Sequence, residues 1–180
     1  IQQLPELKYV SQQMTTSYNM NWDGRPEPID ERWLAWKVVN QIKQFTRTQL
    51  EYKFKLMPPE IIWHEEKDNK WLVDQMMVVA DCVTDDIYEW ALNRVIKNLR
   101  VSDLPTITFV KSTPILCAQR LHVGDYKNTV ETLAVLKEDI EKQGYRIKGP
   151  HREIYLLPAM GCYPAEKCHT IVRVELEALI

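Results

Sequence analysis

The chain has 180 residues, 45% of them hydrophobic, which is enough to bury a core without disulfides or metals. Lysine and arginine total 23 against 25 aspartate and glutamate, a formal charge of −2. This balance lacks the basic excess that phosphate binding requires, so we expect no nucleic-acid partner. Charged residues interrupt every apolar run before about 18 residues, and no charged-then-apolar leader is visible, so we expect neither a membrane span nor a signal peptide.

The four cysteines form no Cys-x-x-Cys pair, and the chain has no Asn-x-Ser/Thr site. Reduced thiols in the cytoplasm are the plain interpretation. Cys162, Cys168 and His169 lie close together, but their spacing fits no common zinc pattern, so we expect no metal. The five glycines form no nucleotide-binding motif, and no serine lies in a G-x-S-x-G, so no cofactor is expected.

The first part of the chain is predicted to form a strand, a helix and two more strands. An extended segment spans residues 7–14, and Asp30 can cap a helix that follows it. The apolar stripe of this helix consists of Leu34, Val38, Ile42 and Phe45. Residues 52–56 alternate between polar and apolar, which predicts a strand that runs to residue 65 with an interruption at two prolines. A strand over 70–81 completes a hairpin.

The second part is predicted to repeat that order after a connection. Thr84 caps a helix over about 84–98, and a strand follows at 106–111. An extended segment over 115–123 then leads into a helix that begins near Asn128 and stops at Gly144. Strands over 152–157 and 169–176 end the series.

This order predicts an α+β domain with an antiparallel sheet, built from duplicated strand-helix-strand-strand halves. The two pseudo-repeats cover about 5–82 and 106–177, and the helix over about 84–98 joins them within one domain of residues 1–180. We expect a central ligand cleft along their seam, since such seams are common ligand sites.

The densest run of chemically active side chains is His151-Arg152-Glu153-Ile154-Tyr155-Leu156. On a strand, His151, Glu153 and Tyr155 point to one face. One interpretation is an ordinary strand with a wet face. The other is that Glu153 lies in a cleft, where it either stays ionised and pairs with cations or, if desolvation raises its pKa, acts as a general acid or base.

Six tryptophans fall in the first half of the chain, and we expect most to pack in the core and about two to line a site. Trp63 is the best candidate for the site, because Glu60 and Trp63 flank a proline-interrupted bend. His122 could act as a base, but a single histidine at a strand end is more often structural.

Four stretches carry a family resemblance: Pro58-Pro59-Glu60-Ile61-Ile62-Trp63, Leu121-His122-Val123-Gly124-Asp125-Tyr126, His151 to Leu156, and Glu166 to Arg173, with weaker agreement at Trp22 to Glu27. They resemble the GyrI-like family, the effector-binding domain of multidrug-responsive transcription activators, and most closely its free-standing branch without a DNA-binding domain. Two positions depart from the branch: Arg152 replaces a histidine and Ile61 replaces a glycine.

The resemblance implies that a bulky, flat, often cationic molecule binds in the central cleft around Glu153. Tyr155 would lie beside Glu153, Trp63 would stack on the ligand, and Glu60 would lie at the cleft edge. The remaining residues expected to contact the ligand are His151, Trp71, His122 and Tyr126. Some members of the branch hydrolyse cyclopropane-containing, DNA-alkylating compounds. In that case Glu153 would activate water and Tyr155 would orient it.

Three functions remain open from the sequence. The first is binding of lipophilic, cationic small molecules for sensing or sequestration, which needs only Glu153 and aromatic walls. The second is hydrolysis of planar electrophiles, with Glu153 as general base and Tyr155 beside it. The third is inhibition of a protein partner, as in some relatives. The departures at Arg152 and Ile61 favour binding over hydrolysis.

Overall fold

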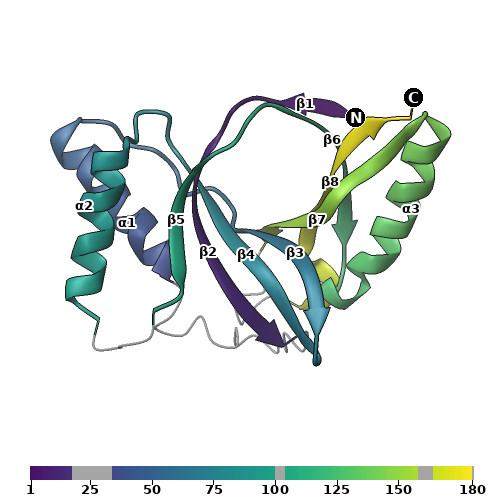
Figure 1. Ribbon diagram of the computed structural model, residues 1–180, viewed down its shortest axis with the longest axis horizontal. Coiled ribbons are helices and arrows are strands. Elements are labelled where there is room, and N and C mark those ends of the chain that lie inside the picture. The colour runs from purple at the N-terminus through teal and green to yellow at the C-terminus, as the bar shows by residue number, and fades with distance from the viewer. Residues whose placement is uncertain (18–33, 100–103, 158–163, 180) are drawn as a thin grey trace.

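A computed structural model of the chain describes residues 1–17, 34–99, 104–157 and 164–179 (Figure 1). The strands are β1 (Gln2–Leu4), β2 (Lys8–Ser17), β3 (Glu60–Lys67), β4 (Lys70–Val79), β5 (Thr106–Lys111), β6 (Ile115–Val123), β7 (Tyr145–Leu157) and β8 (His169–Ala178). The helices are α1 (Leu34–Gln49), α2 (Asp85–Lys97) and α3 (Thr129–Lys142), with short 3-10 turns η1 (Tyr126–Asn128) and η2 (Ala165–Lys167).

All eight strands form one antiparallel sheet with the order β1-β6-β8-β7-β3-β4-β2-β5. In each half of the chain the third strand of the strand-helix-strand-strand unit lies between the first and second, and β3 pairs with β7 where the halves meet. The α+β class and the antiparallel sheet are therefore confirmed. The limits of the two pseudo-repeats stay a prediction.

Two short links force the sheet to curl. Residues 5–7 join β1 to β2, and residues 112–114 join β5 to β6. Each link connects strands six positions apart, about 29 Å in a flat sheet at ~4.8 Å per strand. Three residues span only a little over ~10 Å, so the ends of the sheet must approach each other. We call the face that carries the helices the outer face and the opposite one the inner face.

The helices cover two separate parts of the outer face. In Figure 1, α1 and α2 lie together at one flank of the sheet and α3 lies at the other. The first core joins α1 and α2 to β2 and β4, with Val38, Ile42 and Val10 fully buried. The second core joins α3 to β6 and β8. Between them lies a third cluster, which the next subsection describes. No helix in the described ranges is long and apolar enough to cross a membrane.

The segment over 52–56 is not a strand, contrary to the sequence prediction. A turn at Glu51, which has a positive φ of 52°, follows α1, and β3 begins only at Glu60. Phe54 and Leu56 pack against the core of α1 and α2, so the alternation reflects one buried side of an extended loop. Pro58 and Pro59 lack the N–H groups that a ladder needs.

Other boundaries differ by smaller amounts. Strand β1 was not predicted, and β7 begins at Tyr145 rather than at residue 152. Strand β4 ends at Val79, two residues early. The strands at 106–111 and 115–123 have the predicted limits. The predicted cap at Asp30 lies outside the described residues.

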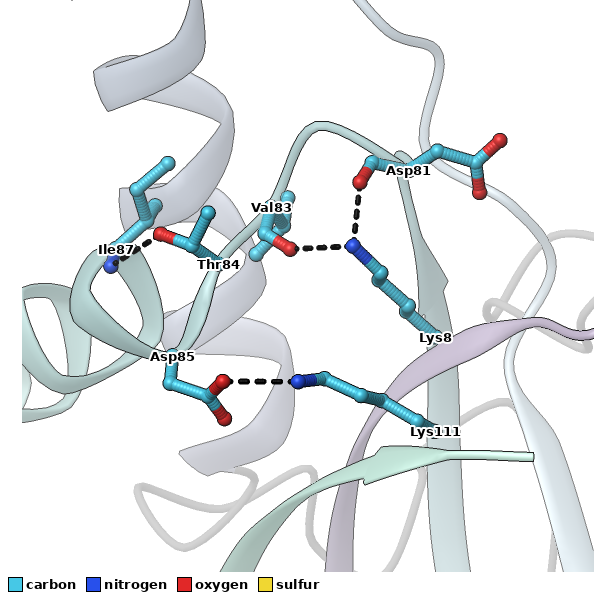
Figure 2. A network of polar contacts seen from close by, with 7 residues as sticks. All are labelled: Lys8, Asp81, Val83, Thr84, Asp85, Ile87 and Lys111. Carbon is cyan, nitrogen blue, oxygen red and sulfur yellow. Dashed lines mark hydrogen bonds and ion pairs between the residues drawn. The ribbon is translucent and has the colours of Figure 1, made fainter.

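Lysines from two strands hold the start of α2 against the sheet (Figure 2). Lys8 on β2 donates to the carbonyl oxygens of Asp81 and Val83, the latter at 2.8 Å. Lys111 on β5 pairs with Asp85 at 2.8 Å. The Thr84 hydroxyl accepts a hydrogen bond from the Ile87 N–H at 3.3 Å, which caps the helix as the sequence predicts.

We expect Thr84→Ala to lower the free energy of unfolding by about 1 kcal/mol, because it leaves an N–H of the first helical turn without its acceptor. Urea denaturation followed by circular dichroism measures this change. Thr113→Ala, at an exposed position of the β5–β6 link, is the matched control and should cost less than about 0.5 kcal/mol. Equal losses in the two variants would contradict the assigned cap.

Candidate functional site

A cavity of about 320 Å³ opens on the outer face, between the β3–β4 hairpin and the start of α3. Its floor is the middle of β7. The residues that line it are Trp63, Trp71, Tyr126, Lys127, Thr129, Val130, Leu133, His151, Glu153 and Tyr155. Six of the eight residues expected from the sequence to contact a ligand are therefore brought together: Glu153, Tyr155, Trp63, Trp71, His151 and Tyr126.

Strand alternation and register together build this floor. Glu153 and Tyr155 lie two residues apart on β7, so both point to the outer face. Ile61 on β3 is the register partner of Glu153, and Trp63 lies two residues further along the same face. Ile61 is buried and belongs to the same apolar cluster as Trp63 and Tyr155. The isoleucine that replaces the glycine of the resembling branch thus packs directly beside the carboxylate.

Glu153 is a buried carboxylate, with its side chain 6% exposed. The Tyr155 hydroxyl donates to Glu153 Oε2 at 2.5 Å, and His151 Nε2 lies 3.6 Å from Oε1. Burial alone would raise the pKa of Glu153, but its hydrogen bonds with His151 and Tyr155 outweigh burial and hold the pKa below its ordinary value. Glu153 is therefore ionised at neutral pH.

The same contact acts in the opposite direction on Tyr155. Burial and the adjacent charge of Glu153 raise the pKa of Tyr155 well above its ordinary value. The phenol therefore stays protonated and keeps its proton directed at the carboxylate. This proton satisfies one lone pair of Glu153 without neutralising its charge.

Aromatic rings form the walls around this carboxylate. Trp63 and Trp71 meet edge to face, with ring centroids 5.6 Å apart. Tyr126 and Tyr155 meet in the same way at 5.2 Å. Such edge-to-face pairs fix ring orientation, so the aromatic lining of the cavity is preorganised.

The start of α3 supplies a wall that the sequence interpretation missed. Asp125 accepts a hydrogen bond from the Lys127 N–H at 3.0 Å, and the Thr129 hydroxyl donates to the Tyr126 carbonyl at 2.8 Å. These bonds fix the turn that directs Thr129, Val130 and Leu133 toward the cavity. The available signal was their helical spacing: Leu133 follows Val130 by three residues and Thr129 by four.

Glu60 does not lie in this cavity. It is the register partner of Ile154, so it points to the inner face, where Arg152 Nη1 donates to its Oε2 at 2.8 Å. Glu60 and Trp63 are three residues apart on one strand and therefore face opposite ways. Glu60 therefore does not lie at the cleft edge, where the resemblance placed it. It forms a buried ion pair with Arg152 on the opposite face of the sheet.

His122 also lies away from the cavity. Its Nδ1 lies 2.8 Å from the Thr132 hydroxyl and its Nε2 lies 2.9 Å from the Asp125 carbonyl. Both ring nitrogens are thus used to tie the end of β6 to the start of α3, which matches the structural interpretation of this residue. Within the described ranges no group of three or more histidines, cysteines or acids could hold a metal ion, and Cys162 lies outside those ranges.

We expect Tyr155→Phe to lower the free energy of unfolding by about 1–3 kcal/mol at pH 7, because it removes a donor from a buried charge. The effect should depend on pH, because the pKa of Glu153 is lower in the folded than in the unfolded protein. Ionised Glu153 therefore stabilises the folded protein at pH values above the unfolded carboxyl pKa of about 4.3. This contribution is lost as the pH falls through the folded pKa of Glu153. Urea denaturation between pH 8 and 3 should therefore give two curves that converge at low pH.

Tyr145→Phe is the control for this measurement. Tyr145 lies on the same strand, and its hydroxyl has no hydrogen-bond partner among the described residues. It should change the free energy of unfolding by less than about 0.5 kcal/mol at any pH. A constant difference between wild type and Tyr155→Phe across the pH range would contradict the assigned role of the phenol.

Comparison with known proteins adds the following. No family model and no curated protein matches the chain. Among solved structures, a hydrolase from Listeria innocua is 23% identical with a TM-score of 0.75 and covers 98% of this chain and 91% of that chain. An uncharacterized conserved protein from Listeria innocua is 22% identical with a TM-score of 0.77 and the same coverage. The EcmrR C-terminal domain is 16% identical with a TM-score of 0.57, covering 98% of this chain and 95% of that chain. The resemblance stated from the sequence is thereby confirmed as one of fold: the chain has the GyrI-like fold.

Proposed function

We propose that this protein binds bulky, planar, lipophilic cations in the outer-face cavity, with Glu153 as their counter-ion. One observation carries the proposal: Glu153 is buried and ionised, yet it pairs with no lysine or arginine in the part of the chain that the structure describes. Burying a carboxylate costs several kcal/mol unless a partner compensates it. Tyr155 and His151 supply part of that compensation, and a bound cation would add the full positive charge that no lysine or arginine among the described residues brings.

The walls of the cavity suit the same ligand. The faces of tryptophan and tyrosine rings attract cations, with a contribution of about 0.5–2 kcal/mol for each well-placed ring. A cavity of about 320 Å³ is at the lower end of the range for small-molecule sites, and it is open on one side. A flat molecule would therefore insert its cationic part between Trp63 and Tyr126 and leave its remainder outside. This arrangement supports sensing or sequestration of drug-like molecules.

The one lysine in the lining does not oppose this assignment. Lys127 is exposed, so its ammonium group can remain in water while its aliphatic stem contacts the cavity.

The three described cysteines are free, which supports a cytoplasmic location for the binding protein.

Hydrolysis of a planar electrophile is the second candidate. The Listeria innocua protein of similar fold is named a hydrolase, and Glu153 Oε1 is the carboxylate oxygen that Tyr155 leaves open. In this reaction Glu153 Oε1 would take a proton from a water molecule, and the oxygen of that water would attack a cyclopropane carbon. A ring C–C bond would break, its electron pair would move into the conjugated carbonyl of the ligand, and a proton would return there. The net change is addition of water. The lowered pKa of Glu153 makes it a weak base, which favours binding.

The test of both candidates is a titration of tryptophan fluorescence with acridine orange as the planar cation and with neutral anthracene. For wild type we expect saturable quenching by both, with the cation bound more tightly. Glu153→Gln should weaken acridine orange binding at least about tenfold, since a buried charge pair is lost, and should change anthracene binding by less than about threefold.

Glu177→Gln is the matched control, because it removes an exposed carboxylate on β8 that pairs with Arg146 at the surface. It should leave both affinities unchanged. Equal binding of acridine orange to wild type and Glu153→Gln would contradict the counter-ion role. Incubation with a cyclopropane-fused planar enone, followed by mass spectrometry, separates the second candidate: a water adduct formed by wild type and not by Glu153→Gln would establish hydrolysis.

A further inference from the structure

The two carboxylate oxygens of Glu153 differ in their contacts with the protein. Oε2 accepts a hydrogen bond from the Tyr155 hydroxyl at 2.5 Å. Oε1 has only a longer contact, with His151 Nε2 at 3.6 Å, whereas a charge-assisted N–H···O bond is about 2.7–2.9 Å long. Glu153 is buried, so one oxygen of a charged group lacks a close donor among the residues that the structure describes.

Two other polar side chains line the same cavity, but neither donates to Glu153 Oε1. The Thr129 hydroxyl directs its single proton to the Tyr126 carbonyl oxygen at 2.8 Å. Lys127 is exposed and forms no ion pair with Glu153 within the described ranges. A close donor for Oε1 must therefore come from water or from a bound molecule.

A ligand that fills the cavity must take over this role from water. Much of the lining is apolar or aromatic, with Trp63, Trp71, Val130 and Leu133 around the carboxylate. Displacing water from a polar group lowers affinity when the ligand does not reproduce the hydrogen bond of that water. The loss is larger for a charged acceptor than for a neutral one. The ligand that suits Glu153 thus brings a hydrogen-bond donor as well as a positive charge.

Organic cations fall into two kinds in this respect. A protonated ring nitrogen carries an N–H group, which can approach a carboxylate oxygen to about 2.8 Å. A fully alkylated nitrogen offers only C–H groups, whose carbon atoms remain about 3.3–3.6 Å from the oxygen and hold the nitrogen farther away still. The faces of aromatic rings attract both kinds of cation. The carboxylate oxygen, in contrast, distinguishes between them.

We propose that the outer-face cavity selects planar cations that carry an N–H group at the edge of the ring system, and that this group donates to Glu153 Oε1. Fully N-alkylated cations of the same size and charge bind more weakly. Because Tyr155 already donates to Oε2, one N–H group is sufficient. This inference rests on the proposed binding of lipophilic cations and names their chemical class.

The experiment compares three dyes of equal charge by titration of tryptophan fluorescence in the full chain at pH 7. Acridine orange is protonated on its ring nitrogen at this pH and has one N–H group there. Its 9-methyl derivative keeps this group, whereas the isomeric 10-methyl cation has a methyl group on the ring nitrogen instead. We expect the first two dyes to bind within about threefold of each other and the 10-methyl dye to bind at least about tenfold more weakly.

Glu153→Gln distinguishes the hydrogen bond from a steric effect of the methyl group. A methyl group that only collides with the cavity wall would weaken binding equally in wild type and in the variant. Loss of the charge-assisted bond predicts instead that the ratio of the two isomers' Kd values falls from at least about ten to less than about three. Glu177→Gln, which changes an exposed carboxylate, should keep the wild-type ratio. The comparison of the isomers in wild type does not depend on whether a variant folds.

Equal affinity of the two isomers for wild type would overturn the proposal, and so would an equal ratio in wild type and Glu153→Gln. If all three dyes nevertheless bind more weakly to Glu153→Gln, the counter-ion role of Glu153 stands and only the selection of N–H groups is wrong. If no dye binds to wild type, the proposed function and this inference are both wrong. The two failures are therefore distinguishable.

Discussion

Strands β3 and β7 pair over three residue positions, and this short ladder joins the two halves of the sheet. Its register decides what each face carries. Glu153 is opposite Ile61 on the outer face, whereas Ile154 and Arg152 share the inner face with Glu60 and Ile62. A slip by one residue would exchange the faces, placing Arg152 among the tryptophans and Glu153 beside Tyr9. The outer-face cavity and the buried pair of Arg152 and Glu60 therefore both depend on this one ladder.

The way in which Glu153 is stabilised is important for its availability. An arginine partner would satisfy the carboxylate but would also cancel its charge, as Arg152 does for Glu60. The Tyr155 phenol instead donates a hydrogen bond and leaves the charge on the carboxylate, while the imidazole of His151 lies 3.6 Å from its other oxygen. Among the described residues two glutamates are thus buried, 93 positions apart, one neutralised and one left charged. Only the second lies in an aromatic cavity.

Much of this arrangement could be predicted from the sequence, because alternation along one strand is a local property. Glu153 and Tyr155 share a face wherever β7 lies, and Thr84 caps α2 through a bond to a residue three positions away. The position of Glu60 could not be predicted in this way. It depends on where β3 begins after Pro58 and Pro59 and on its partner in β7, which lies more than 90 residues later. Local patterns do not specify that register.

The limits of the strands were missed for a related reason. Phe54 and Leu56 alternate with lysines as strand residues would, but they cover the end of a helical core rather than pair with a neighbour. The alternation of apolar and polar residues indicates which side chains are buried, but it does not indicate whether they pack against a helix or a neighbouring strand. Conversely, the three residues of β1 are too few to show an alternation of apolar and polar residues. This strand forms only because it pairs with the edge of β6.

The pairing of β1 with β6 also sets an order of events during synthesis. Gln2 is opposite Cys117, so β1 finds its partner only after about 115 further residues have been made. The hairpin of β3 and β4 and the helices α1 and α2 can form earlier, since the two strands pair with each other and the two helices pack together within residues 34–97. The residues of β1 thus emerge from the ribosome well before the strand with which they pair, and they are among the last to reach their final position.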